Sequence, residues 1–228
     1  MVIKKSLRVY GMIFILSILL IVSVYQLFVF MMLDLLDKEL QGWQGQESAS
    51  ESYTRWENQR PMVDLLVSVS PYSGAVQQSS ARFYQLGAEL ASAAPSSMPV
   101  ATQHQDRALQ LIRQSLSNQP VWPLAWMDLA YIKSSLGLFD DEFQQAFSLA
   151  IATGAAETNI LLGMTEVGFA GWRDLSAANR LQFVSLLDIA VLRERQHVID
   201  AAEYYQRTYI VCLLISEKQA MEQYCKNR

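Results

Sequence analysis

Apolar residues in the stretch 108–150 recur at the intervals that two stacked antiparallel helices require. Small and large side chains share one face, so the backbones of neighbouring helices can approach closely. The expected packing positions are Ala108, Pro120, Trp126, Leu129, Ala130, Ala146 and Ala150, with Phe83 before them and Trp172 after them. This spacing predicts an all-α domain whose helices pack in consecutive pairs.

The same intervals resemble the tetratricopeptide repeat, whose period is about 34 residues with Trp, Leu-Gly, Tyr, Ala, Phe and Pro at set places. Residues 108–120 match the second helix of one unit, and residues 126–150 match the next unit. Phe83, Leu86-Gly87 and Leu90 have the intervals of a first repeat helix, but the loop 92–100 after them is longer than a regular repeat would have. Leu162-Gly163 could start a third unit, but its frame is slipped. We therefore expect a degenerate tetratricopeptide-like solenoid, closed by helices that do not repeat. Such repeats bind partners, which predicts a scaffold.

Turn residues divide the domain into helices. Pro61 suits a helix start within residues 53–69, and the Ser-Pro-Tyr-Ser-Gly run at 70–74 predicts a turn. Segment 208–215 is rich in β-branched residues and is expected to be extended or helical. The other expected helices cover residues 76–91, 104–117, 123–135, 140–153, 157–169, 176–192 and 197–206.

An uncharged run at residues 9–33 precedes the domain. It exceeds the about 20 residues that cross a bilayer as a helix. It is also longer than the apolar core of a cleavable signal peptide, about 7 to 15 residues, and no small-x-small cleavage site follows it. We therefore expect a transmembrane helix at 9–33, a juxtamembrane linker at 34–52 and the repeat domain at 53–228.

The charges around this run predict its orientation. Lys4, Lys5 and Arg8 precede it, whereas all 22 acidic residues follow it. Positively charged flanks stay in the cytoplasm. Residues 1–8 are thus expected to be cytoplasmic and the domain periplasmic, with the helix in the inner membrane of a bacterium. An acidic domain has no footprint for nucleic acid, which excludes that class of partner.

Cys212 and Cys225 are the two cysteines of the chain. In an oxidising compartment such a pair is expected to be bridged rather than free. If the chain is extended up to a Ser216–Gln219 capping box that starts a new helix, folding back brings the two sulfurs level. The spacing predicts a Cys212–Cys225 disulfide, and the alternative is two buried, unbridged side chains.

A longer resemblance covers roughly residues 55–192. Residues 119–130, Lys133, Leu136-Gly137 and residues 140–146 resemble the VpsP family of polysaccharide biosynthesis proteins, and the later Trp172, Leu175 and Arg180 are similar to its pattern. Residues 154–156 depart from the family's usual Gly-Pro-Trp. Members are short, carry one N-terminal membrane span and are encoded among bacterial exopolysaccharide genes. The resemblance implies a pathway rather than a reaction, and no catalytic residue carries over.

In such solenoids, the residues next to the packing positions in the sequence line the concave groove. The candidate groove residues are Tyr84, Met127, Tyr131, Ser134 and Ser135. These side chains suit a peptide, a partner helix or sugar rings stacked on tyrosine, and the alternative is simple exposure or contact with the C-terminal helices. The expected partners are inner-membrane or periplasmic proteins of a polysaccharide synthesis or export complex, with glycan left open, and the lipid bilayer around residues 9–33.

Signals for catalysis are weak. Asp140-Asp141-Glu142 complement the positive end of a helix that Asp140 caps, so no metal is expected. Glu47-Ser48 matches the Glu-Ser pair of lytic transglycosylases but lies in a polar linker, where no burial raises the pKa of the glutamate. His104, expected among polar neighbours, and His197, beside a charge run, carry no motif for a metal or nucleophile.

We therefore expect no enzyme and no cofactor, but an accessory scaffold of exopolysaccharide biosynthesis or export. A scaffold or assembly factor of another envelope machine, such as a pilus or secretion system, is the alternative. A glycan-active enzyme stays open only through Glu47.

Overall fold

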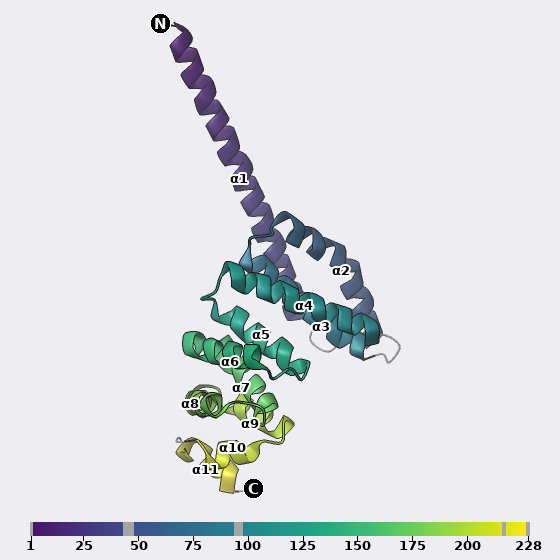
Figure 1. Ribbon diagram of the computed structural model, residues 1–228, viewed down its shortest axis with the longest axis vertical. Helices are drawn as coiled ribbons and strands as arrows, with labels where there is room; N and C mark the ends of the chain where they lie inside the picture. The colour runs from purple at the N-terminus through teal and green to yellow at the C-terminus, as the bar shows by residue number, and fades with distance from the viewer. Residues whose placement is uncertain (1, 43–47, 94–97, 216–217, 227–228) are drawn as a thin grey trace.

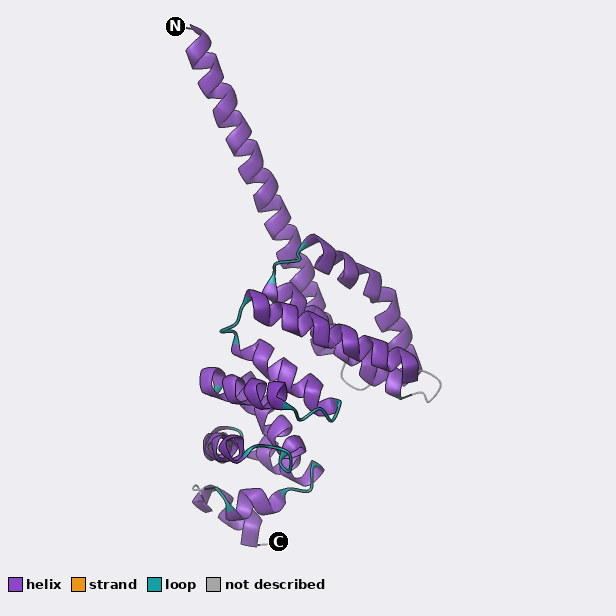
Figure 2. Ribbon diagram, in the orientation of Figure 1, coloured by secondary structure: helices purple, strands orange, loops and turns teal. Residues whose placement is uncertain are grey.

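The computed structural model describes residues 2–42, 48–93, 98–215 and 218–226, and all regular secondary structure in these ranges is helical. One long helix, α1 (Val2–Gly42), projects from a body that α2 to α11 build (Figure 1). Figure 2 shows helices joined by short loops, without a strand in the described ranges. The prediction of an all-α fold is confirmed.

Helix α1 carries a segment, Met12–Leu40, that is long and apolar enough to cross a membrane. The side chains of residues 12–28 are exposed, and from Val29 onward apolar residues on one face of the helix pack into the core of the body. The residues on this face are Val29, Met32, Leu33, Leu36 and Leu40. Contact with the domain therefore starts inside the run 9–33, before the end that the sequence predicted for the free span.

Three consecutive antiparallel helical hairpins form most of the body. In the first, α3 (Gly74–Ser92) meets α4 (Met98–Asn118), and Ser115 Oγ donates to the Gly74 carbonyl oxygen at 2.8 Å. In the second, the end of α6 (Asp141–Gly154) packs on Pro123 at the start of α5 (Pro123–Ser135). In the third, Arg193 at the end of α8 (Ala177–Arg193) donates to the Ala156 carbonyl oxygen, just before α7 (Thr158–Gly171).

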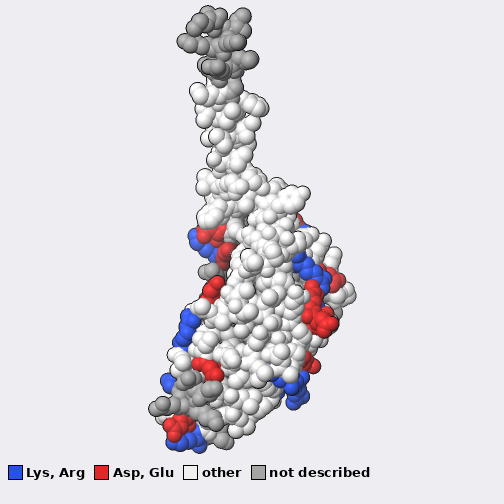
Figure 3. All heavy atoms as spheres, turned by 60° about the vertical axis from the view of Figure 1, so that its left-hand side comes forward, with Lys and Arg blue, Asp and Glu red and all other residues white. Residues whose placement is uncertain are grey.

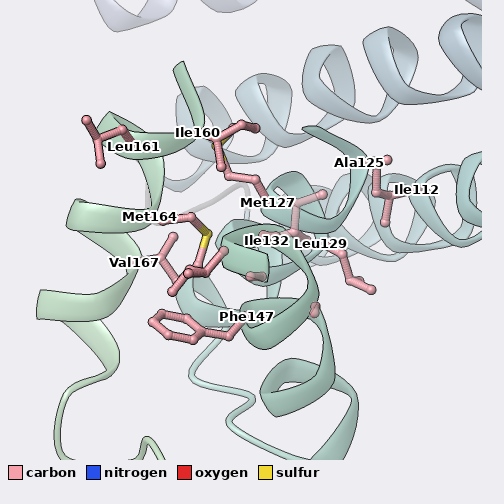
Figure 4. Close-up of a cluster of buried hydrophobic side chains, with 14 of the residues drawn as sticks. Ile112, Ala125, Met127, Leu129, Ile132, Phe147, Ile160, Leu161, Met164 and Val167 are labelled. Carbon is pink, nitrogen blue, oxygen red and sulfur yellow. The ribbon is translucent and has the colours of Figure 1, made fainter. Parts of the chain in front are cut away.

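The remaining helices cover the two ends of this stack. Helix α2 (Ala49–Val69) packs on α3, and α9 (Arg195–Tyr204), α10 (Thr208–Leu213) and α11 (Lys218–Lys226) close the opposite end (Figure 1). The hairpins bury a continuous apolar core. In the part drawn in Figure 4, Met164 and Val167 of α7 lie beside Ile132 of α5 and Phe147 of α6.

Helix α2 differs from the expected helix in where it begins and in the place of Pro61. It begins at Ala49, because Ser48 and Glu51 form a capping box, and Pro61 lies inside the helix instead of at its start. A proline inside a helix removes one backbone donor, but the fully buried Trp56 and Val63 on either side hold the segment in place. Since α1 runs to Gly42, most of the linker expected at 34–52 is helical, and residues 43–47 lie outside the described residues.

Most of the expected packing residues are buried, namely Phe83, Ala108, Leu129, Ala130, Ala146 and Ala150. Trp126 and Trp172 are half-buried against the same core. Pro120 is exposed, so its expected packing role is wrong. It lies in the turn between α4 and α5, where its carbonyl oxygen accepts a hydrogen bond from Trp126 Nε1 at 2.8 Å.

Cys212 and Cys225 are joined by a disulfide with a Cα–Cα distance of 5.6 Å. The local structure differs from the extended segment on which the pairing was argued, because residues 208–213 form α10. Ile210 and Val211 are fully buried in it, and this packing outweighs their β-propensity. Ser216 of the expected capping box lies outside the described residues, and Gln219 lies within α11.

Candidate functional site

A groove of about 280 Å³ lies on the face of the body that α3, α5 and α7 share. Alternate helices of the three hairpins therefore contribute to it. The lining residues are Arg82, Gln85, Leu86 and Glu89 of α3, Met127, Asp128, Tyr131 and Ile132 of α5, and Gly163 and Glu166 of α7.

The middle of the groove is apolar and carries one accessible aromatic ring. Met127 and Ile132 are buried, whereas Tyr131 is 37% exposed. The Tyr131 hydroxyl donates to Glu89 Oε1 at 3.2 Å, and Gln85 Nε2 donates to the same oxygen at 3.0 Å. Burial raises the pKa of Tyr131 and the Glu89 carboxylate raises it further, so this hydroxyl is a hydrogen-bond donor and not a base.

At the floor of the groove, the buried Asp128 pairs with the half-buried Arg82. Asp128 accepts hydrogen bonds from Arg82 Nε at 2.8 Å and from the side-chain amide of Gln78, which ties α5 to α3. Burial raises the pKa of Asp128, while Arg82 and Gln78 act against that rise.

The rim of the groove is acidic. Glu89 is exposed and Glu166 is half-buried on the opposite wall. The Glu166 carboxylate lies 3.5 Å from Nε2 of His197, which also contacts the Leu162 carbonyl oxygen at 3.2 Å. An apolar centre between two carboxylates fits a partner that presents an apolar side chain flanked by Lys or Arg.

The chain matches no protein-family model, and comparison with curated proteins and with solved structures finds no similar protein. The role of the groove must therefore be argued from its own chemistry.

Of the five residues predicted for the groove, only some line it in the structure. Met127 and Tyr131 line it, and Ser135 adjoins it by accepting a hydrogen bond from Gln85 Nε2 at 3.0 Å. Ser134 is half-exposed on α5 but is not among the lining residues. Tyr84 faces away, because its helix turns it toward α2 and α4, where its hydroxyl donates to Asp64 Oδ1 at 2.6 Å.

Sequence reasoning missed the α3 and α7 walls of the groove. Leu86 and Glu89 follow Arg82 at helical spacing, on the side of α3 away from the buried Phe83 and Gly87. That spacing was a usable signal for one wall. Glu166 was not predictable in the same way, because only the stacking of α7 on α5 brings it to the groove.

A second, polar cleft of about 540 Å³ lies between α2, α3 and α4 and is lined by Arg60, Asp64, Tyr84, Gln103, His104, Asp106, Arg107 and Gln110. His104 has polar neighbours in this cleft, but its ring packs in an aromatic cluster that the sequence did not predict. It is 2% exposed, and its ring centroid lies 4.4 Å from that of Trp56. Burial lowers the pKa of His104 and Arg60 lowers it further, so the ring stays neutral in its aromatic cluster.

The acidic run at the start of α6 has structural partners. Asp140 caps the helix by accepting from the Phe143 amide at 3.0 Å. Lys133, only 1% exposed, reaches Asp140 at 2.8 Å and Glu142 at 2.6 Å. Within the described residues, no group of three or more His, Cys, Asp or Glu side chains is placed to hold a metal. Glu47 lies outside the described residues.

Proposed function

We propose that this chain is a single-pass inner-membrane protein whose periplasmic helical domain acts as an accessory scaffold in exopolysaccharide biosynthesis or export. The observation that carries this proposal is the groove on α3, α5 and α7, with an accessible tyrosine between two acidic walls. The apolar helix α1 supports anchoring, and the basic residues before it support a cytoplasmic N-terminus.

The three stacked hairpins support a degenerate tetratricopeptide-like repeat, since alternate helices of such a repeat line its binding face. The residues of the stretch 119–146 that resemble the VpsP family support the pathway. Anchoring keeps the domain and its partners in the same membrane, so that individually weak contacts suffice for assembly. The partner is a protein segment with an apolar side chain beside a basic one, and a glycan stacked on Tyr131 is the competing ligand.

The proposal assigns no catalytic role to the chain. The alternative hypothesis of a glycan-active enzyme depends on Glu47 alone. Unchanged polysaccharide production in a Glu47→Gln strain supports the scaffold, whereas loss of the polymer in that strain supports the enzyme.

A photo-crosslinking side chain at Leu86 tests the groove in cells that are making the polymer. Leu181 on α8, which is 72% exposed and does not line the groove, is the matched control position. We expect an adduct with a membrane or periplasmic protein of the polysaccharide machinery from position 86 and none from position 181. An adduct with a pilus or secretion component instead supports the alternative envelope machine.

Deletion of the gene tests the pathway independently of the groove. A specific loss of secreted and cell-bound polysaccharide, restored by the gene, supports the proposal. Unchanged polysaccharide under conditions in which the polymer is made contradicts it, whatever protein the groove binds.

A further inference from the structure

Two uncharged stretches of the chain lie beside each other where α1 enters the body. One is the run 9–33 in α1, and the other is the run 65–81, which covers the end of α2, the turn after it and the start of α3. The Tyr25 hydroxyl donates to the Val69 carbonyl oxygen at 2.6 Å and lies 2.9 Å from Ser70 Oγ. The α2–α3 turn therefore lies against the apolar part of α1 and not beyond its end.

Helix α2 runs antiparallel to α1. Its first half meets the end of α1, where Glu39 pairs with Arg55 and accepts from Gln59 Nε2 at 3.0 Å. Its last residue meets Tyr25. The helix thus returns from the charged end of α1 toward the uncharged span. On the face drawn in Figure 3, the top of the body beside α1 is largely white, and charged side chains come into view lower, at its left-hand and right-hand edges.

The length of the membrane span determines where the α2–α3 turn lies relative to the bilayer. A helix needs about 20 residues to cross about 30 Å of hydrocarbon, and counted from Val9 these end at Phe28. Tyr25 then lies about one helical turn inside this boundary. If the turn moved fully into water, the residues before Tyr25 would span only about 24 Å, less than the hydrocarbon thickness.

Three apolar or aromatic side chains at and before the turn are exposed. Leu65 is 54% exposed, Val69 37% and Tyr72 87%. Tyrosine is enriched where a protein crosses the boundary between hydrocarbon and water, because its ring is apolar and its hydroxyl is polar.

Four backbone groups of the turn have hydrogen-bond partners inside the protein. The Val69 carbonyl accepts from Tyr25, and the Pro71 carbonyl accepts from the Gln77 side-chain amide. The Ser70 amide donates to the Leu66 carbonyl oxygen and the Ser73 amide to the Ser70 carbonyl oxygen, each at 3.1 Å. A turn that leaves water must satisfy these groups internally, since each unsatisfied one costs several kcal/mol in lipid.

We propose that the α2–α3 turn is a second membrane contact of the domain, with Leu65, Val69 and Tyr72 inserted into the interfacial zone of the lipid bilayer beside α1. The inference rests on the proposed anchoring by α1. The occupant of this surface is lipid, because the surface continues directly from the span. Two contacts fix the tilt of the body, so the groove is held at a constant angle to the membrane.

The depth of a fluorescent label in lipid tests this contact in the full-length chain. Single cysteines replace Tyr72, Tyr204 or Phe14, carry an environment-sensitive fluorophore, and are compared in vesicles of phosphatidylethanolamine and phosphatidylglycerol. Tyr204 is the matched control, because it is 80% exposed at the opposite end of the body. Lipids with a nitroxide near the headgroup or at mid-chain serve as quenchers.

We expect the label at position 72 to emit further to the blue and to lose most of its emission to the shallow nitroxide, whereas the label at 204 keeps its emission. The label at position 14 must be quenched by the mid-chain nitroxide if α1 spans the bilayer. Quenching at 14 without quenching at 72 or at a Leu65→Cys label overturns the second contact and leaves the anchor intact. Absence of quenching at 14 overturns the anchor itself.

Discussion

Nζ of Lys133 in α5 lies 2.6 Å from Oε2 of Glu142 in α6, and the lysine side chain is 1% exposed. Arg113 of α4 donates two parallel hydrogen bonds to the same carboxylate, at 2.8 and 2.7 Å. One glutamate thus joins three helices from two successive hairpins. The acidic run that the sequence predicted only as a complement to the helix end also holds the hairpins together.

Replacing Lys133 by Met removes the buried ammonium but keeps the volume of the side chain. Asp140 and Glu142 are 56% and 35% exposed and can regain water, so the loss is smaller than for a fully buried pair. We expect the free energy of unfolding to fall by about 1–2 kcal/mol. Urea unfolding of the detergent-solubilised chain, followed by tryptophan fluorescence, measures it. Lys38→Met, which removes an exposed pair with Asp34, is the control with little effect.

Glu142 also predicts a pH dependence of stability. Hydrogen bonds from Arg113 and then from Lys133 lower its pKa from 4.5 to about 2. Because the pKa is lower in the folded state, the stabilisation is complete above pH 4.5 and is lost as the pH falls toward 2. We expect Glu142→Gln to flatten the fall in unfolding midpoint across this window. Equal slopes for both proteins would show that the network does not control acid unfolding.

The helices were predictable where local signals and packing agree. Pro123 marks the first residue of α5, and the expected helix 123–135 has the bounds that the structure shows. Pro61 lies inside a helix although proline disfavours that position, because the buried Trp56 and Val63 hold the helix in place. Ile210 is helical although it is β-branched, because its side chain is buried. A local sequence pattern does not show how distant segments pack, and this packing determines the structure at both positions.

The groove was half predictable for the same reason. Met127 and Tyr131 share one face of α5, and helical spacing alone brings them together. Tyr84 carries the same type of signal but turns toward Asp64. The sequence does not reveal which side of α3 meets α2, because this depends on the contact of Trp56 with Gly87.

That contact gives a prediction about close packing. A Cβ at Gly87 would lie 2.3 Å from the ring of Trp56, whose Nε1 donates to the Phe83 carbonyl oxygen at 2.7 Å. The ring is fully buried and cannot retreat, so we expect Gly87→Ala to destabilise the chain by about 1–3 kcal/mol. Gly163→Ala is the control, because its Cβ meets the flexible thioether of Met127. Equal thermal midpoints for the two variants would contradict the rigidity of the Trp56 contact.

The disulfide gives a prediction about the end of the stack. Met221 of α11 is 1% exposed and Tyr224 donates to Glu203 at 3.0 Å, but Cys212–Cys225 is the covalent link between α10 and α11. We expect a Cys212→Ser/Cys225→Ser variant to be cleaved faster by protease within residues 208–226, while α3 to α8 stay folded. Mass spectrometry of the fragments locates the cuts. Reducing agent should reproduce this pattern in the native chain and add nothing to the variant.

Tyr131 separates folding from partner binding in the proposed groove. Its ring is 37% exposed and its hydroxyl bonds only to the rim residue Glu89 among the described hydrogen bonds. Tyr131→Ala should therefore keep the circular dichroism spectrum of the native chain but weaken the crosslink from position 86, since an aromatic anchor at the centre of an interface carries much of the binding energy. Tyr131→Phe keeps the ring and should retain the crosslink if the partner packs on it. If Tyr131→Ala crosslinks as well as the native chain, the partner binds another surface.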